Sequence, residues 1–78
     1  MYTAAQARQV KQVFVKTMQR FPTESEMQRI YDYDYSEFLA YNNAIDSNQT
    51  FNEYCGNILE DYMAYGCFAD LIETALAA

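Results

Sequence analysis

The chain contains no histidine and no tryptophan, and only two cysteines, two glycines and one proline among its 78 residues. Without histidine it lacks the usual general acid and base near neutral pH, and Ser-His or Cys-His nucleophile pairs cannot form within one chain. Cys55 and Cys67 stand alone, twelve residues apart, which is too sparse for structural zinc and favours small core residues. Neither glycine belongs to a phosphate-binding loop. These absences favour a binding protein over an enzyme, with no cofactor and no metal.

Long apolar runs are also missing, so no segment approaches the roughly 20 apolar residues that cross a bilayer. No secretory signal is recognisable at the start of the chain, and two cysteines are then expected as reduced thiols. We therefore expect a cytoplasmic protein that does not bind membranes. Disorder is excluded by composition, because 51% of the residues are hydrophobic and 17% are aromatic.

Basic residues are absent from the whole chain after position 29. The five that exist are Arg8, Lys11, Lys16, Arg20 and Arg29. The later part carries nine carboxylates: Asp32, Asp34, Glu37, Asp46, Glu53, Glu60, Asp61, Asp70 and Glu73. An acidic surface without interspersed bases repels nucleic acid and attracts basic protein surfaces. The expected partner is a protein with a basic surface, and direct nucleic-acid binding is not expected.

Three helix starts can be recognised from one repeated pattern, a Thr followed three residues later by Gln or Glu. In this capping box the two residues satisfy each other's free backbone amides. The pairs are Thr3 with Gln6, Thr23 with Glu26, and Thr50 with Glu53. They predict a single all-α domain over 1–78, a small three-helix bundle with helices at about 4–21, 24–45 and 51–77.

The segment 4–21 has a basic amphipathic pattern. Its apolar residues fall on one face at helical spacing: Val10, Val13, Phe14, Met18 and Phe21. One interpretation is a helix for a membrane surface or an anionic partner; the other is a core helix whose bases pair with acids of the same domain. The surplus of acids elsewhere in the chain favours the second interpretation.

The segment 24–45 carries a longer stripe of apolar residues: Met27, Ile30, Tyr31, Phe38, Tyr41 and Ile45. Asp34 falls on the same stripe, where a carboxylate either caps a break or belongs to a site. Because Glu37 follows it by three residues, Asp34 fits a capping position, which allows a kink near Tyr33.

The segment 51–77 is too long for the first helix to cover if it is one continuous helix. Apolar residues near its end, such as Phe68, Leu71 and Ile72, would then lack an intramolecular partner. Two solutions remain open: a fourth short helix after Gly66, or a homo-oligomer through the third helix.

The candidate binding surface is the acidic and tyrosine-rich region, because tyrosine buries a large area and keeps a polar tip. Tyr31, Tyr41, Tyr54 and Tyr62 lie on the apolar stripes and are expected to be structural, which leaves Tyr33 and Tyr35 as surface candidates. The full candidate set is Asp32, Tyr33, Asp34, Tyr35, Glu37, Glu53, Glu60 and Asp61.

In size, acidity and lack of catalytic groups the chain resembles the small anti-restriction and anti-CRISPR proteins of bacteriophages. The resemblance is one of composition and assigns no residue roles. It implies an inhibitor that blocks the basic nucleic-acid-binding surface of a partner protein. The alternatives are a self-associating helical structural or adaptor protein and an oligomer that sequesters a small ligand.

Overall fold

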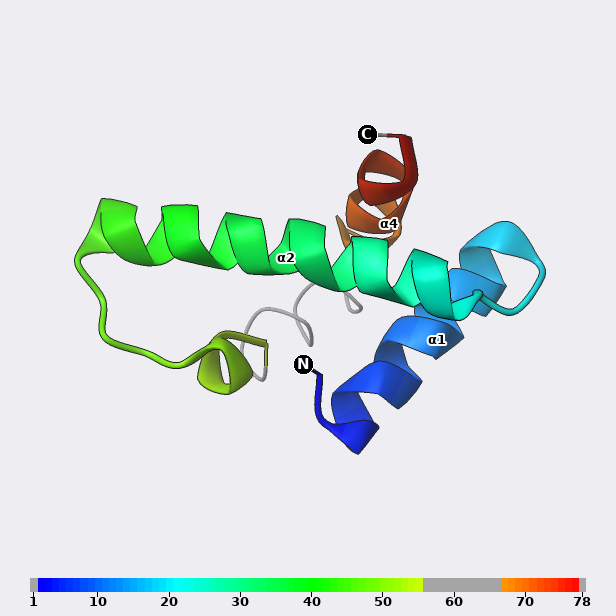
Figure 1. The fold of residues 1–78 in the computed structure, drawn as a ribbon, viewed down its shortest axis with the longest axis horizontal. Helices are drawn as coiled ribbons and strands as arrows, with labels where there is room; N and C mark the ends of the chain where they lie inside the picture. Colours follow the sequence, from blue (N-terminus) through cyan, green and yellow to red (C-terminus); the bar gives the residue numbers. More distant parts are fainter. Residues whose placement is uncertain (1, 56–66, 78) are drawn as a thin grey trace.

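The computed structural model describes residues 2–55 and 67–77. Within these ranges all regular secondary structure is helical: α1 (Ala4–Met18), α2 (Glu24–Ile45), a helical segment over 51–55, and α4 (Cys67–Ala77). The predicted all-α class is confirmed. In Figure 1, α2 runs along the length of the molecule, and both α1 and α4 lie beside its N-terminal half.

All three predicted helix starts are confirmed by reciprocal capping bonds. The Thr3 hydroxyl accepts from the Gln6 amide at 3.2 Å, and the Gln6 side chain accepts from the Thr3 amide at 3.0 Å. Thr23 makes the same pair of bonds with Glu26 at the start of α2. Thr50 with Glu53 opens the segment 51–55 in the same way. Each cap depends on residues no more than three positions apart, and so the sequence alone reveals it.

α1 ends three residues earlier than predicted, and Phe21 is not a core residue. Gln19 takes the left-handed conformation (φ 61°), and its amide donates to the Val15 carbonyl, which closes the last turn. The chain then leaves the helix before Pro22, and Phe21 remains 79% exposed. Helical spacing placed Phe21 on the core face only under the assumption that the helix continued to it.

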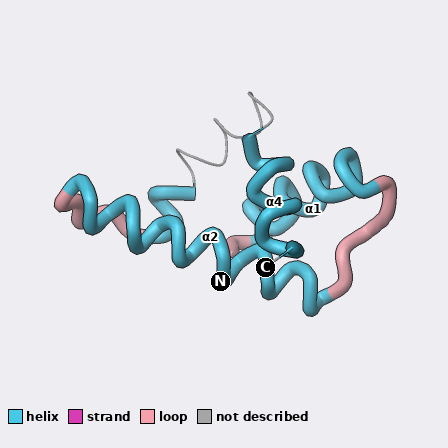
Figure 2. Tube along the Cα trace, turned by 90° about the horizontal axis from the view of Figure 1, so that it is seen from above, coloured by secondary structure: helices cyan, strands magenta, loops and turns pink. Residues whose placement is uncertain are grey.

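α2 matches the predicted bounds of 24–45 and is continuous, so the kink near Tyr33 is wrong. Asp34 does not cap a break, because it lies in the middle of the helix with 1% of its surface exposed. The predicted core stripe is buried at Ile30 and Phe38, but Tyr41 and Ile45 are 42% and 52% exposed. Figures 1 and 2 agree on the reason: α1 and α4 accompany only the N-terminal half of α2.

A single third helix over 51–77 is wrong as well, because α4 is a helix of its own. Of the two solutions that the sequence left open, the fourth helix after Gly66 is the one observed. Phe68, Leu71 and Ile72 are all buried within the monomer, so these residues no longer give a reason for self-association.

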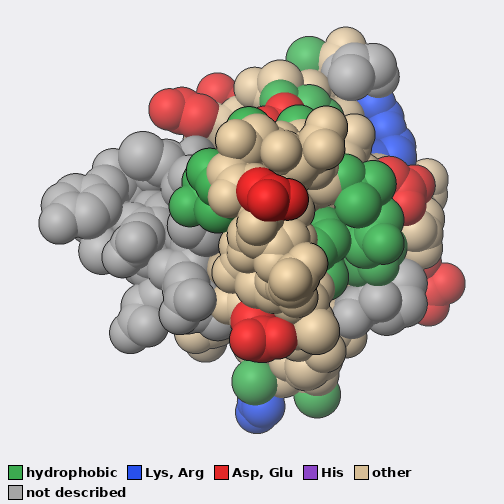
Figure 3. All heavy atoms as spheres, turned by 90° about the vertical axis from the view of Figure 1, so that its left-hand side faces the viewer, with side chains coloured by type: hydrophobic (Ala, Val, Ile, Leu, Met, Phe, Trp, Pro, Cys, Tyr) green, Lys and Arg blue, Asp and Glu red, His purple; other side chains and the backbone are tan. Residues whose placement is uncertain are grey.

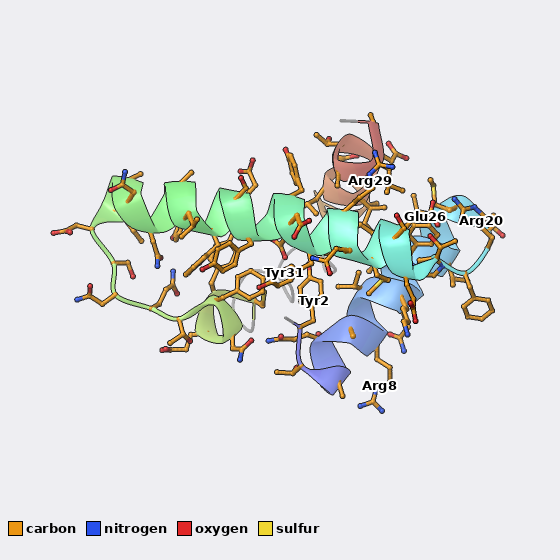
Figure 4. The ribbon with its side chains drawn as sticks, viewed as in Figure 1. Tyr2, Arg8, Arg20, Glu26, Arg29 and Tyr31 are labelled. Carbon is orange, nitrogen blue, oxygen red and sulfur yellow. The ribbon has the colours of Figure 1, made fainter. Side chains whose placement is uncertain are left out.

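The main core forms where α4 packs against both α1 and α2. α4 contributes four of its seven buried members; the full set is Val10, Phe14, Ile30, Phe68, Leu71, Ile72 and Ala75. α2 also holds the end of α4, because the Arg29 guanidinium donates to the Leu76 carbonyl at 2.7 Å (Figure 4). A cation at this position satisfies a carbonyl that the last helical turn leaves free and interacts favourably with the helix dipole.

A second, smaller core lies further along α2. It consists of Phe38, Tyr54 and Cys55, with Tyr2 and Phe51 packed against it. The Phe38 and Phe51 rings are 5.5 Å apart in an edge-to-face arrangement, and the Phe38 and Tyr54 rings are 5.3 Å apart. Ring pairs of this kind add about 0.5–1.5 kcal/mol beyond the area that they bury. Aromatic contacts therefore attach the segment 51–55 to the middle of α2.

The core around α4 can be tested by comparing a fully buried phenylalanine, Phe68, with a largely exposed one, Phe21. We expect Phe68→Ala to lower the free energy of unfolding by about 3–5 kcal/mol, because the Phe68 side chain is fully buried. That loss is a large part of the about 4–12 kcal/mol expected for a chain of 78 residues. Phe21→Ala is the matched control, with an expected change within about 0.5 kcal/mol. Urea denaturation followed by circular dichroism measures both, and equal losses would contradict this core.

Candidate functional site

A buried polar cluster joins the N-terminal segment to α2 and to the segment 51–55. The Tyr2 hydroxyl donates to the Asp34 carboxylate at 2.7 Å, and the Cys55 thiol lies 3.9 Å from the same carboxylate oxygen. In Figure 4, Tyr2 reaches from the start of the chain toward α2 beside Tyr31, and their rings meet edge to face at 5.4 Å. A buried carboxylate requires such partners, since an unsatisfied one would be strongly destabilising.

The environment of Asp34 opposes its ionisation. Burial raises the pKa of Asp34, and the hydrogen bonds from Tyr2 and Cys55 offset only part of that effect. Burial together with the Asp34 charge likewise raises the pKa of Tyr2. The cluster therefore consists of groups that hold their protons at neutral pH or bind them more readily than in water.

The Cys55 thiol is a structural group in this cluster. It is 2% exposed, and burial followed by the Asp34 charge raises its pKa to about 12. Reactive cysteines have lowered pKa values and partly exposed sulfur atoms, so Cys55 lacks both features of a nucleophile. The prediction that Cys55 is a core residue is confirmed. The side chain of Cys67 lies outside what the structure describes.

Asp34 was predicted to contact a partner, and its burial shows that prediction to be wrong. Tyr33 was predicted as a surface residue, but it is only partly exposed and packs against the main core. Asp34 is covered by Tyr2 and Cys55, and Tyr33 by the main core. The sequence carried no sign of this covering, because the covering residues lie far along the chain.

Asp32 and Tyr35 are exposed and share one face of α2, three residues apart. Leu39 follows Tyr35 by four residues on the same face and is 52% exposed. We call Asp32, Tyr35 and Leu39 the outer face. Sequence reasoning missed Leu39, although its position off the apolar stripe of α2 was a usable signal. Tyr35 is also supported from below, because the Phe51 ring lies 5.3 Å from its own.

Glu37 is exposed but lies on another side of α2, about 140° around the helix axis from Asp32. Its neighbours at four-residue spacing are Tyr41 and Ile45, which are both exposed. Glu53 is exposed in the segment 51–55, where the Thr50 backbone amide and hydroxyl lower its pKa. The structure thus brings Asp32 and Tyr35 together and separates Glu37 from them. Glu60 and Asp61 lie outside the described residues.

Among the basic residues of the segment 4–21, the predicted pairing with an acid of the same domain is found for Arg20. Arg20 forms a two-pronged salt bridge with Glu26 at 2.8 and 2.6 Å across the α1–α2 connection, seen in Figure 4. This bridge, with the Thr23 backbone amide, lowers the pKa of Glu26 to about 2. By contrast, Arg8, Lys11 and Lys16 have no carboxylate partner among residues 2–55 and 67–77. For these three, the expected pairing with acids of the same domain is not found there.

Two further features of the described part of the chain concern metal ions and membranes. No group of three or more His, Cys, Asp or Glu side chains comes together there in a way that could hold a metal ion. None of the described helices is both long enough and apolar enough to cross a membrane.

Comparison of the chain with protein-family models, with curated proteins and with solved structures finds no match. Any functional conclusion therefore depends on the surfaces and contacts of the chain itself.

The hydrogen bond from Tyr2 to Asp34 can be tested by removing one oxygen atom. We expect Tyr2→Phe to lower the free energy of unfolding by about 1–3 kcal/mol, because Asp34 would lose its strongest donor while staying buried. Tyr35→Phe is the matched control, since the Tyr35 hydroxyl has no partner among the described residues and should change stability by less than about 0.5 kcal/mol. Equal effects in urea denaturation would argue against the buried cluster.

The raised pKa of Asp34 predicts a pH dependence with a defined sign. In the folded state this pKa lies above its ordinary value of 3.8, so the folded chain binds the proton more tightly than the unfolded chain. The resulting stabilisation is complete below that value and is lost as the pH rises through the folded-state pKa. We expect the stability of the wild-type chain relative to Asp34→Asn to fall as the pH rises above about 4 and through the folded-state pKa of Asp34.

Urea denaturation of both proteins at a series of pH values measures this difference. Glu26, whose pKa is lowered to about 2, loses its contribution as the pH falls below 4.5, but it does so equally in both proteins. Its effect therefore cancels in the comparison. Parallel stability curves for the wild type and Asp34→Asn would show that Asp34 is not responsible.

Proposed function

We propose that this chain is a non-enzymatic inhibitor that binds the basic, nucleic-acid-binding surface of a partner protein through the outer face of α2. The observation that carries the proposal is the combination of Asp32 with the exposed Tyr35 and Leu39 on one continuous helix. A carboxylate beside an aromatic and an aliphatic anchor is suited to a protein surface that combines Lys or Arg side chains with apolar contacts.

Rigidity of the outer face supports this role. α2 is an unbroken helix of 22 residues, and the aromatic cluster around Phe38 and Phe51 holds its middle in place. A preformed helix face loses little conformational freedom on binding, so more of the contact energy appears as affinity. Tyr35 is a suitable anchor because Phe51 already restricts its ring before a partner arrives.

Electrostatics supports the choice of partner. The chain has a net charge of −6, and no basic residue lies after Arg29. Carboxylates that occupy a Lys or Arg surface exclude the phosphates which that surface would otherwise bind. Inhibition then needs only occupancy of the partner's surface and no reaction on it.

Paired affinity captures test this proposal. The wild-type chain and the Asp32→Lys variant serve as parallel baits in an extract of the native host, and mass spectrometry identifies proteins retained only by the wild type. Charge reversal at Asp32 should weaken binding at least about tenfold, because it places like charges together in the contact. Glu73→Lys, the same change at an exposed position of α4, is the control and should retain the partner.

The purified partner then allows a direct test of mechanism. Binding should weaken as salt rises, because the distance over which charges act, the Debye length, falls from about 10 Å at 0.1 M salt to about 3 Å at 1 M salt. The chain should also compete with nucleic acid for the partner. A complex that resists salt, or that binds chain and nucleic acid together, would contradict the proposed inhibition.

A further inference from the structure

The exposed side of α1, opposite its core residues Val10 and Phe14, bears an open groove of about 440 Å³. Its lining consists of Arg8, Lys11, Gln12, Val15, Lys16 and Phe21. We call it the α1 groove. The walls are apolar, since they are made by Val15, by the aliphatic stems of the long side chains and by the ring of Phe21. Phe21 remains 79% exposed at its edge.

Three cations surround this apolar groove without carboxylate partners among the described residues: Arg8, Lys11 and Lys16. Figure 4 shows Arg8 projecting outward from α1, away from the rest of the protein. Arg20, which follows the end of α1, already forms a salt bridge with Glu26, and its guanidinium lies over the Phe14 ring, 5.1 Å from the ring centroid. The groove is therefore suited to an apolar segment flanked by acids.

The opposite end of the molecule carries such a segment. Glu37, Tyr41 and Ile45 follow one another at four-residue spacing along α2, and the exposed Asp46 ends the helix. We call these four residues the α2 ridge. Tyr41 and Ile45 are 42% and 52% exposed. Figure 3 views this end of the molecule, where Asp and Glu side chains lie among hydrophobic ones and Lys and Arg appear only at the edges.

The two surfaces match in length as well as in charge. Arg8 and Lys16 are eight residues apart on α1, or about 12 Å, and Glu37 and Ile45 are likewise eight residues apart along one side of α2, with Asp46 after them at the helix end. Within one molecule they cannot meet. The longest dimension is 37 Å, and Figure 1 places the end of α2 and the outer side of α1 at opposite ends.

We infer that the α1 groove of one copy receives the α2 ridge of a second copy, giving a head-to-tail contact between different surfaces of the same chain. Such a contact leaves one groove and one ridge free at the two ends, so further copies add until a ring closes or a filament forms. A second copy is favoured over an anionic membrane as the occupant. The ridge supplies both the acids and the apolar centre that the groove requires.

The contact is expected to be weak. Each surface is formed by only four to six side chains, whereas a standard stable interface buries about 800 Å² per partner, or roughly 20–30 residues a side. Self-association should therefore have a dissociation constant on the order of 0.1–1 mM at low salt and should weaken as salt screens the charges. Sedimentation velocity over a series of protein concentrations, at low and at high salt, measures both effects.

Complementary charge reversals give the decisive test. One variant, Lys11→Glu with Lys16→Glu, makes the groove acidic. The other, Glu37→Lys with Asp46→Asn, changes the charge of the ridge from negative to positive. Asn is chosen at position 46 because it tolerates the left-handed conformation that Asp46 adopts (φ 53°). Each variant alone should self-associate at least about tenfold more weakly than the wild type, because like charges would meet. An equal mixture of the two should associate again, since every groove then faces a complementary ridge.

Folding of each variant is checked by circular dichroism, and Glu73→Lys on α4 serves as the charge control that should associate like the wild type. Three results would overturn the inference: a strictly monomeric wild type at low salt, unchanged association of the groove variant, or no association in the mixture. Binding of the monomer to anionic lipid vesicles that is lost in the groove variant would also overturn it, with a membrane as the occupant. The proposed inhibitor function uses the outer face instead, so Asp32→Lys should leave self-association unchanged.

Discussion

The rest of the structure depends on the packing of α4 between α1 and α2. Among the described helices, the backbones of α1 and α2 do not approach each other closely, and α4 contacts both. The apolar residues Phe68, Leu71, Ile72 and Ala75 therefore provide the surface on which the two longer helices bury Val10, Phe14 and Ile30. A chain of 78 residues has a core near the minimum that can support a fold, and so this contact is decisive. Arg29 strengthens it by holding the Leu76 carbonyl at the end of α4.

Because α1 and α4 cover only the N-terminal half of α2, the remainder of that helix has to be supported in another way. Among the described residues, the aromatic cluster of Phe38, Phe51 and Tyr54 provides this support, and it covers one side of the helix. The exposed residues Tyr35, Leu39, Tyr41 and Ile45 are a direct consequence. The two surfaces proposed for binding thus arise from the length of α2 relative to its neighbours. Both are held on a continuous helix, which limits the conformational freedom that binding would remove.

Asp34 stabilises the fold from a buried position, although the acidic and tyrosine-rich sequence around it predicted a binding surface. Charged side chains are seldom fully buried unless they are paired, and Asp34 is paired with a residue 32 positions earlier in the chain. Its neighbours Asp32 and Tyr35 remain exposed. Helical periodicity correctly placed Asp34 on the apolar stripe, but it did not distinguish a buried hydrogen-bonded carboxylate from a helix cap.

The sequence by itself determined the all-α class, the three capping boxes and both ends of α2, because these features follow from hydrogen bonds and apolar spacing within a few residues. Tertiary structure decided which residues of each stripe are buried. Phe21, Tyr41 and Ile45 have the spacing of core residues but remain exposed, whereas Asp34 is covered by Tyr2 and Cys55. Burial depends on which distant segments arrive at a position, and that information is not contained in the local pattern.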